Sequence, residues 1–180
     1  MNLYRVSTTE LDVGGTIMPN PEGFLSNISG FQKIAEDFID EHIPHELGIN
    51  SRKECVFLFL DLKNAIEYYL KAPGDQHIYI YEVSIHPEDI LRKCDMGLID
   101  VIKKLVEFKA NISVINQMCI YYWHSGSTPS SCYEYLVKKA TIENLLWEGN
   151  TLEIKKQCGR AGSIERTSLY NSCLTHSGRK

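Results

Sequence analysis

The sequence predicts an α+β domain in which a mixed sheet is flanked by helices. Three patterns predict this class: a strongly alternating segment at residues 77–85, a continuous apolar run at residues 55–60 that leads directly into a helical pattern, and two apolar stripes of helical spacing between residues 98 and 122. Because the helical patterns cluster between the strand patterns, a mixed sheet is favoured over a regular doubly wound fold.

The N-terminal part of the chain begins with a strand and a helix. Apolar and polar side chains alternate over residues 3–7, which predicts the first strand. Residues 19–30 are rich in Pro, Gly, Asn and Ser, so a loop is expected there. Apolar residues then recur with helical spacing over residues 31–39, and this stripe predicts an amphipathic helix.

A buried strand that passes straight into a helix comes next. Residues 55–60 form an unbroken apolar run that is short and sharply bounded, as buried strands are. Asp61 follows at once as the expected N-cap, and residues 62–70 continue at helical spacing. Residues 77–85 alternate and are rich in aromatic and β-branched side chains, so they give the clearest strand pattern of the chain.

The second half of the chain is predicted to hold two helices followed by strands. Helical spacing marks residues 98–106 and 112–122, and alternation marks a strand at residues 132–137. The same reasoning adds two further strands, at residues 140–146 and 151–154.

The folded domain is expected to cover residues 1–158. Residues 159–180 are polar, contain Gly and Ser and show little periodicity. Such a segment buries little apolar surface, so a polar C-terminal tail is expected, either mobile or loosely packed as an arm.

Composition and charge limit the classes of partner. Hydrophobic residues make up 43% and charged residues 23% of the chain, as in ordinary globular domains, which argues against disorder. The net charge of −4 provides no broad positive field, so nucleic acid is a disfavoured partner. Apolar runs fall short of the roughly 18 residues that cross a bilayer, so no membrane contact is expected. The expected location is the cytoplasm, or the cytosol of a target cell into which the protein is delivered, where the six cysteines stay reduced.

Two charged residues interrupt apolar strand patterns. Arg5 stands in the first strand pattern, and Glu134 stands in the pattern at residues 132–137. A charge on a strand most often lies on the solvent face, so each residue alone is weak evidence for a site. The order of the patterns around them gives a further indication.

In their order along the chain, four segments resemble parts of the NAD-dependent ADP-ribosyltransferase superfamily, which includes rifampicin-modifying enzymes and bacterial toxins. They are the first strand Leu3-Tyr4-Arg5-Val6-Ser7, which is similar to the motif that grips NAD, the strand-helix unit 56–66, the middle strand 78–83 and the acid-bearing strand 133–137. The resemblance spans residues 1–146 and implies an ADP-ribosyltransferase-like fold with two packed β-sheet halves flanked by helices. It implies function only by association.

Departures from the family pattern favour a distant subfamily, such as a bacterial toxin or effector. Cys132 stands where arginine-modifying members have the first of two acids, so an arginine acceptor is disfavoured. Phe57 stands where rifampicin-modifying relatives have Tyr, and no Ser-Thr-Ser signature follows the second strand.

The resemblance implies that NAD, as co-substrate, is cleaved at the nicotinamide–ribose bond and that ADP-ribose passes to an acceptor. Cleavage proceeds through an oxocarbenium-like state that a carboxylate stabilises, and Glu134 is the residue implied for this catalytic role. Arg5 would anchor the phosphate region of NAD, and Ser7 would bond the nicotinamide amide or a ribose. Glu82, inside the alternating pattern 77–85, is the competing acid.

Aromatic side chains are expected to stack on the nicotinamide ring, which needs a flat apolar partner. The candidates are Phe57, Tyr68 and Tyr69, although aromatics on apolar stripes are more often core residues. The expected acceptor is a protein side chain, favoured over nucleic acid or a small molecule. A toxin of this kind is also expected to have an immunity or antitoxin partner.

Two other classes of function stay open. A cysteine hydrolase would pair Cys119 with His124, or Cys132 with His86, but no local nucleophile motif marks either cysteine. A non-catalytic module would bind NAD, ADP-ribose or a protein without chemistry. Nicotinamide release that is lost in Glu134→Ala would separate the enzyme from such a module.

A metal site is not expected. His42 and His45 have Pro44 between them, and their spacing matches none of the strong paired-cysteine zinc patterns.

Overall fold

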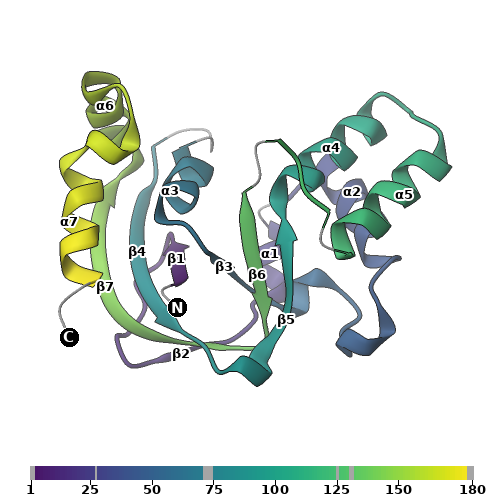
Figure 1. The fold of residues 1–180 in the computed structure, drawn as a ribbon, viewed down its shortest axis with the longest axis horizontal. Coiled ribbons are helices and arrows are strands. Elements are labelled where there is room, and N and C mark those ends of the chain that lie inside the picture. Colours follow the sequence, from purple (N-terminus) through teal and green to yellow (C-terminus); the bar gives the residue numbers. More distant parts are fainter. Residues whose placement is uncertain (1–2, 27, 71–74, 125, 130–131, 178–180) are drawn as a thin grey trace. The chain divides into compact units, whose positions relative to one another are not determined.

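The computed structural model describes residues 3–26, 28–70, 75–124, 126–129 and 132–177. The chain forms two compact units, each assembled from separate stretches of sequence (Figure 1). The first unit comprises Met1–Ile17, Leu58–His86 and Ala140–Lys180, and the second comprises Met18–Phe57 and Pro87–Lys139.

The first unit is built on antiparallel strands. Its strand order is β2 (Thr16–Ile17), β7 (Ala140–Asn150), β4 (His77–Ser84) and β1 (Leu3–Ser7), followed by β3 (Val56–Phe59), which begins in the second unit. The pairs β2–β7, β7–β4, β4–β1 and β1–β3 are all antiparallel. The buried residues of these strands are mainly Val, Ile and Leu, which suit a pleated surface.

Helices α3 (Leu62–Leu70), α6 (Thr151–Ala161) and α7 (Ser168–Ser177), with the short 3-10 helix η4 (Ile164–Arg166), complete the first unit. Helix α7 packs along β7, as the yellow ribbon in Figure 1 shows. The predicted N-cap is confirmed, because the Lys63 backbone N–H donates to the Asp61 carboxylate over 2.7 Å.

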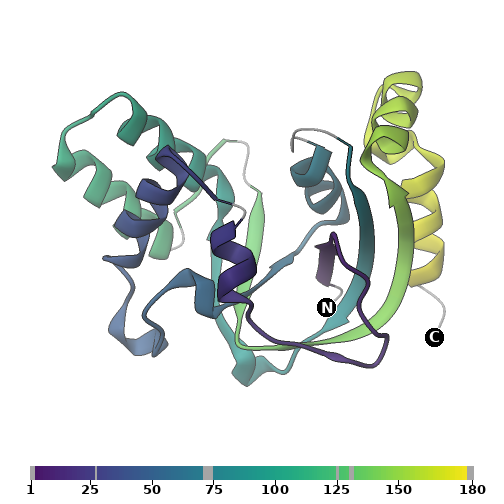
Figure 2. The ribbon, with the colours of Figure 1, turned by 180° about the vertical axis from the view of Figure 1, so that it is seen from behind.

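The second unit joins one strand pair to a group of helices. Strands β5 (Ile90–Asp95) and β6 (Tyr133–Val137) pair antiparallel. The helices of this unit are α1 (Pro21–Ser26), α2 (Phe31–Asp40), α4 (Met96–Glu107) and α5 (Ile112–Trp123), together with three short 3-10 helices, η1 (His45–Leu47), η2 (Arg52–Glu54) and η3 (Pro87–Asp89). Helices α2, α4 and α5 pack against one another (Figure 2).

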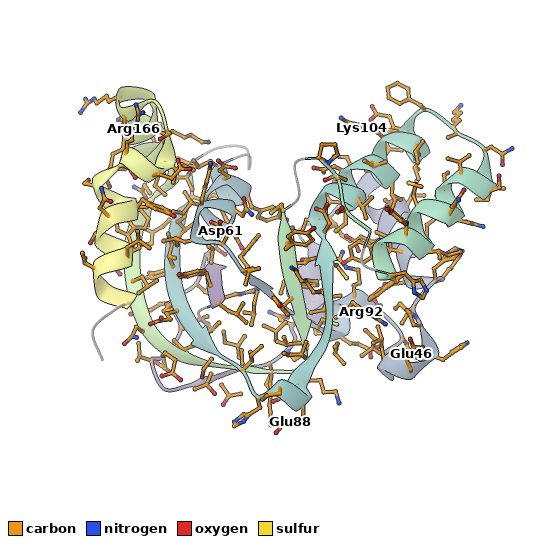
Figure 3. The ribbon with its side chains drawn as sticks, in the orientation of Figure 1. Glu46, Asp61, Glu88, Arg92, Lys104 and Arg166 are labelled. Atoms are coloured by element: carbon orange, nitrogen blue, oxygen red, sulfur yellow. The ribbon has the colours of Figure 1, made fainter. Side chains whose placement is uncertain are left out.

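The core of the second unit is apolar and continuous. It includes the fully buried side chains of Ile39, Ile102, Tyr122 and Trp123, and the indole N–H of Trp123 donates to the Ile39 carbonyl over 2.9 Å. At its surface, the Arg92 guanidinium on β5 pairs with Glu46 over 3.3 Å; both residues are labelled in Figure 3.

The α+β class predicted from the sequence is confirmed. The strands at residues 3–7, 56–59, 77–84 and 133–137 form where alternation or an apolar run predicted them, and so do helices α2, α3, α4 and α5. The strand pairs described within each unit are antiparallel, so they do not include the parallel pairs that a mixed sheet requires.

Two local predictions are wrong, and one strand was not predicted. Residues 21–26 form helix α1 inside the stretch that was expected to be a loop. Residues 151–154, predicted as a strand, begin helix α6, because the Thr-Leu-Glu-Ile pattern is too short to distinguish the two periods. Strand β5 was missed because Arg92 and Lys93 interrupt its apolar pattern; it forms through pairing with β6.

The C-terminal segment contains the helices η4 and α7, so of the two alternatives for residues 159–180 the described part is a packed arm and not a mobile tail. Within its described part, Ile164, Leu169 and Cys173 are buried. These apolar residues are too sparse to give a periodic signal, yet the first unit provides a surface that covers them. Residues 178–180 of the predicted tail lie outside the described residues. Among the described helices, none combines the length and apolar character that crossing a bilayer requires.

Candidate functional site

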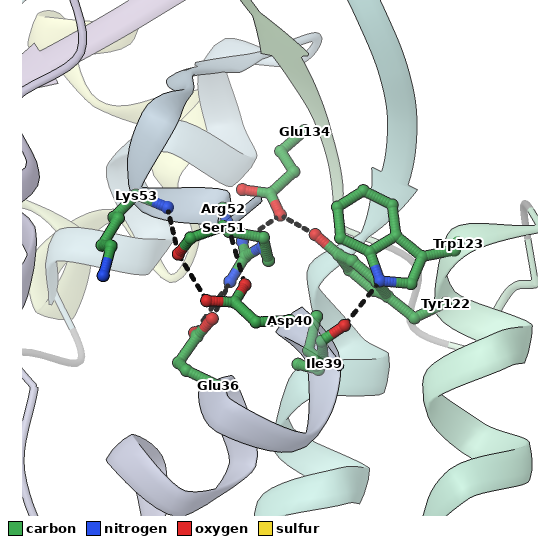
Figure 4. Close-up of polar contacts among 9 residues, drawn as sticks. All are labelled: Glu36, Ile39, Asp40, Ser51, Arg52, Lys53, Tyr122, Trp123 and Glu134. Carbon is green, nitrogen blue, oxygen red and sulfur yellow. Dashed lines mark hydrogen bonds and ion pairs between the residues drawn. The ribbon is translucent and has the colours of Figure 1, made fainter. Parts of the chain in front are cut away.

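The carboxylate of Glu134 lies in a buried ionic cluster of the second unit (Figure 4). Glu134 stands on β6 and is 1% exposed. Its Oε1 accepts a hydrogen bond from Arg52 Nη2 over 2.7 Å and another from the Tyr122 hydroxyl over 2.9 Å. The acid expected to act on NAD is therefore bound by two neighbouring side chains.

Arg52 connects Glu134 to helix α2. Its Nη1 donates to both carboxylate oxygens of Glu36, over 2.7 and 2.6 Å, and the guanidinium carbon lies 5.0 Å from the ring centre of Phe57 and 5.2 Å from that of Tyr122. Charge-assisted bonds and flanking aromatic rings are the environment that makes a buried guanidinium tolerable. Phe57, expected to stack on nicotinamide, thus contacts Arg52.

The local fold explains how α2 reaches this cluster. Glu36 and Asp40 are four residues apart on α2, so they project from the same helix face. Asp40 accepts hydrogen bonds from the Ser51 hydroxyl and from the Arg52 backbone N–H, the latter over 2.9 Å. These contacts fix the start of η2 and thereby the origin of the Arg52 side chain.

Burial and charge pairing act in opposite directions on the pKa values of the cluster. Burial raises the pKa of Glu134 above its ordinary value, although the Arg52 charge and the Tyr122 hydrogen bond act in the opposite direction. Burial also works to lower the pKa of Arg52, but Glu36, Tyr122 and Glu134 outweigh it and raise that pKa well above its ordinary value. Arg52 therefore stays charged.

Sequence reasoning did not identify Arg52 or Glu36 as site residues. They are separated from Glu134 by 82 and 98 residues, and each stands in an unremarkable polar context. No local pattern could have paired them, because the contacts depend on how α2, η2 and β6 pack.

Arg5 and Ser7 lie in the first unit, on one face of β1. In the β1–β4 register Arg5 lies opposite Tyr81 and Ser7 opposite Tyr79, and in the β4–β7 register Tyr79 lies opposite Glu148. Residues directly opposite on neighbouring strands project from the same side of a sheet. We call the surface formed by Arg5, Ser7, Tyr79, Tyr81 and Glu148 the Arg5 face.

Aromatic rings run along β4 on the Arg5 face. The ring centres of His77 and Tyr79 are 4.9 Å apart at an interplanar angle of 68°, and those of Tyr79 and Tyr81 are 6.3 Å apart and nearly parallel at 17°. The Tyr81 hydroxyl accepts the backbone N–H of Leu11 over 2.8 Å. Burial raises the pKa of Tyr81, so its hydroxyl stays neutral.

The two tyrosines proposed from α3 have structural contacts. The Tyr69 hydroxyl donates to the Val6 carbonyl over 3.0 Å, which ties α3 to β1, and burial raises its pKa. Tyr68 is 44% exposed, and its ring centre lies 5.6 Å from that of Phe59 and 5.4 Å from that of Tyr69.

Glu82 projects from the opposite side of β4. It lies opposite Tyr4, not Arg5, and its Oε2 accepts the Asn144 side-chain N–H over 2.8 Å. Because it projects from the opposite side of the sheet and is bound by Asn144, Glu82 does not belong to the Arg5 face.

Four of the six thiol groups are poorly suited to nucleophilic catalysis. Burial raises the pKa of Cys119, the candidate nucleophile beside His124, to about 12. The pKa values of Cys55, Cys94 and Cys173 are likewise raised to about 12. Thiols with such values form almost no thiolate at neutral pH. Among the described residues, no group of three or more His, Cys, Asp or Glu side chains is placed to hold a metal ion.

The structure thus brings together Arg5 and Ser7 in the first unit, and Glu134 and Phe57 in the second. Each pair has a different setting. On the Arg5 face, Glu148 is exposed and Arg5 and Tyr79 are half-buried, whereas Ser7 and Tyr81 are buried, with 8% and 0% of their surface exposed. The Arg52 cluster is a closed set of mutual contacts. No protein-family model, curated protein or solved structure matches this chain.

Proposed function

We propose that this protein is an ADP-ribosyltransferase that binds NAD against the Arg5 face and cleaves the nicotinamide–ribose bond. The observation that carries the proposal is the register that aligns Arg5 and Ser7 with the rings of Tyr81 and Tyr79. The resemblance of the first strand to an NAD-gripping motif, and the order of strands and helices after it, support the same reaction and an ADP-ribosyltransferase-like fold.

The groups on the Arg5 face fit the parts of NAD. A guanidinium binds phosphate oxygens through several parallel donors, and Arg5 on β1 provides one. Ser7, two residues along the same strand, offers a hydroxyl that already bonds Thr9 Oγ1 over 3.2 Å. The half-buried ring of Tyr79 presents a flat surface on which nicotinamide or adenine would stack.

Glu134 has a structural role in this proposal. Its Oε1 is held by Arg52 and Tyr122, and a buried carboxylate so bound would have to leave a charged partner to reach a ribose. This geometry weighs against the direct catalytic contact that the resemblance implied for it.

The proposed acceptor is a protein side chain, with the protein acting as a toxin or effector that an immunity or antitoxin protein would neutralise. The net charge of −4 favours a protein acceptor over nucleic acid, because it gives no general attraction for a phosphate backbone. Mass spectrometry of a lysate treated with the protein and isotope-labelled NAD would identify the modified residue.

Substitution of Arg5 tests the binding site. With NAD, the wild-type protein is expected to release nicotinamide, measured by chromatography. Arg5→Ala should raise the KM for NAD about tenfold or more, with a smaller effect on kcat, because a binding contact is lost. The matched control is Arg166→Ala, which removes an exposed guanidinium from η4 of the same unit. Equal KM values in both variants would remove Arg5 from the site.

A second function is favoured by one observation, the engagement of Glu134 by Arg52. A non-catalytic module would bind NAD or ADP-ribose on the Arg5 face without cleaving it. Calorimetric titration of the wild-type protein with NAD, followed by chromatography of the same sample, separates the two functions. Saturable binding with intact NAD after prolonged incubation would favour the module.

A further inference from the structure

The Arg5 face contains a carboxylate that sequence reasoning did not single out. Glu148 stands near the end of β7 and is exposed. It lies opposite Tyr79, which in turn lies opposite Ser7. The three residues therefore form one row across three adjacent strands.

The row fixes the spacing of its members. Neighbouring strands lie about 4.8 Å apart, so the backbones of Ser7 and Glu148 are about 10 Å apart with the Tyr79 ring between them. Arg5 occupies the next row of the same face, opposite Tyr81. A guanidinium, an aromatic ring and a carboxylate are thus arranged within the length of a dinucleotide.

The influence of Glu148 on Tyr81 supports this placement. The pKa of Tyr81 is raised first by burial, and the charges of Glu10 and Glu148 add to the effect. Only Glu148 of these two stands on a paired strand, where the sheet fixes its backbone, since Glu10 lies outside the helices and strands, after β1.

The other acids considered have less access to this face. Glu82 projects from the opposite side of the sheet and is bound by Asn144. Glu134 is engaged by Arg52 and Tyr122 in the second unit.

We propose that Glu148 is the carboxylate that contacts the NAD ribose and stabilises the transition state of nicotinamide release. This inference rests on the proposed function and names its catalytic residue. Because Glu148 is exposed on a rigid strand, it can accept a ribose hydroxyl hydrogen bond without losing a buried partner.

The reaction needs only NAD and either water or an acceptor side chain. The bond between the nicotinamide nitrogen and ribose C1′ breaks, and its electron pair leaves with nicotinamide, which becomes neutral. Positive charge develops at C1′ and the ring oxygen, near the Glu148 carboxylate. Water or the acceptor side chain forms the new bond to C1′, and its proton passes to Glu148 and then to solvent.

The test compares Glu148→Gln with two other variants of the full chain, using NAD as the probe. Glu148→Gln should lower kcat about 100-fold or more, within the range for a lost acid–base group, and leave the KM for NAD within about threefold. Glu153→Gln is the matched control, because Glu153 is exposed on α6 of the same unit. It should behave as the wild-type protein does. Glu10→Gln tests the neighbouring carboxylate.

Each outcome is decisive. Loss of kcat in Glu148→Gln alone supports the assignment. Unchanged kcat in Glu148→Gln, or loss only in Glu10→Gln, overturns the assignment but leaves the proposed function standing, because the wild-type protein still cleaves NAD. A wild-type protein that binds NAD without releasing nicotinamide overturns both. Circular dichroism and thermal melting of each variant report whether the fold is retained.

Discussion

Arg52 is 2% exposed and lies among Glu36, Glu134 and Tyr122, so the cluster holds one positive and two negative groups away from water. Burying a charge is costly unless a partner of opposite charge offsets it. Arg52 supplies that partner for both carboxylates at once. Its side chain links α2 to β6, two elements about a hundred residues apart.

Arg52→Met should strongly destabilise the protein. The substitution keeps the apolar stem but leaves Glu36 and Glu134 without their buried cation, a loss of about 3–5 kcal/mol in comparable cases. Urea denaturation of the variant measures this change in the free energy of unfolding.

Arg92→Met is the matched control for Arg52. In the Arg92–Glu46 ion pair the Glu46 side chain is 67% exposed, so water screens the interaction. Loss of this ion pair should therefore lower the free energy of unfolding by less than about 1 kcal/mol. Similar losses in the two variants would contradict the structural role assigned to the Arg52 cluster.

Among the elements, β5 and α7 form where local pattern is weak. Strand β5 has Arg92 and Lys93 in its middle and is fixed by pairing with β6. Helix α7 has only a few apolar residues, but Leu169 and Cys173 are buried and the helix packs along β7. Tertiary contacts thus supply the stability that propensity does not.

Leu169→Ala should destabilise the protein by about 2–5 kcal/mol, because it removes buried methyl groups and leaves a cavity. Leu174→Ala, on the same helix but 45% exposed, should change the unfolding free energy by only about 0.5 kcal/mol. Differential scanning calorimetry of both variants checks the contrast. A small effect of Leu169→Ala would mean that α7 contributes little to the fold.

At the scale of the whole molecule, the chain passes between its two units four times, at residues 17–18, 57–58, 86–87 and 139–140. A single cut therefore cannot release either unit, and the experiments proposed above use the full chain. Strand β3 spans one of these crossings, because Phe57 belongs to the second unit and Phe59 to the first.

The pH dependence of unfolding should reveal the buried acid. Because burial raises the pKa of Glu134 above 4.5, the folded protein binds a proton there more tightly than the unfolded chain does. The contribution of Glu134 to stability is therefore greatest below that value and falls as pH rises through the raised pKa. Glu134→Gln removes this titration. The unfolding free energy of the wild-type protein minus that of the variant should decline as pH rises above 4.5. A difference that increases with pH would mean that attraction to Arg52 outweighs burial.

The sequence by itself determined the α+β class and most of its elements. Side chains that face the core recur with the period of the strand or helix that carries them. A short stretch of sequence therefore predicts the strand at residues 77–85 and the helices α2, α4 and α5. The same holds for Asp61, whose capping bond reaches only two residues along the chain.

Only the tertiary structure decided where the charges lie. Arg5 and Glu134 looked alike as charged interruptions of strands, yet one lies on a sheet face beside Tyr81 and the other is buried against Arg52. The position of Glu148 beside Tyr79 follows from strand register, and the helical C-terminal segment from the surface that buries Leu169. Register and burial are set by residues far apart in the chain, whereas a local pattern records only near neighbours.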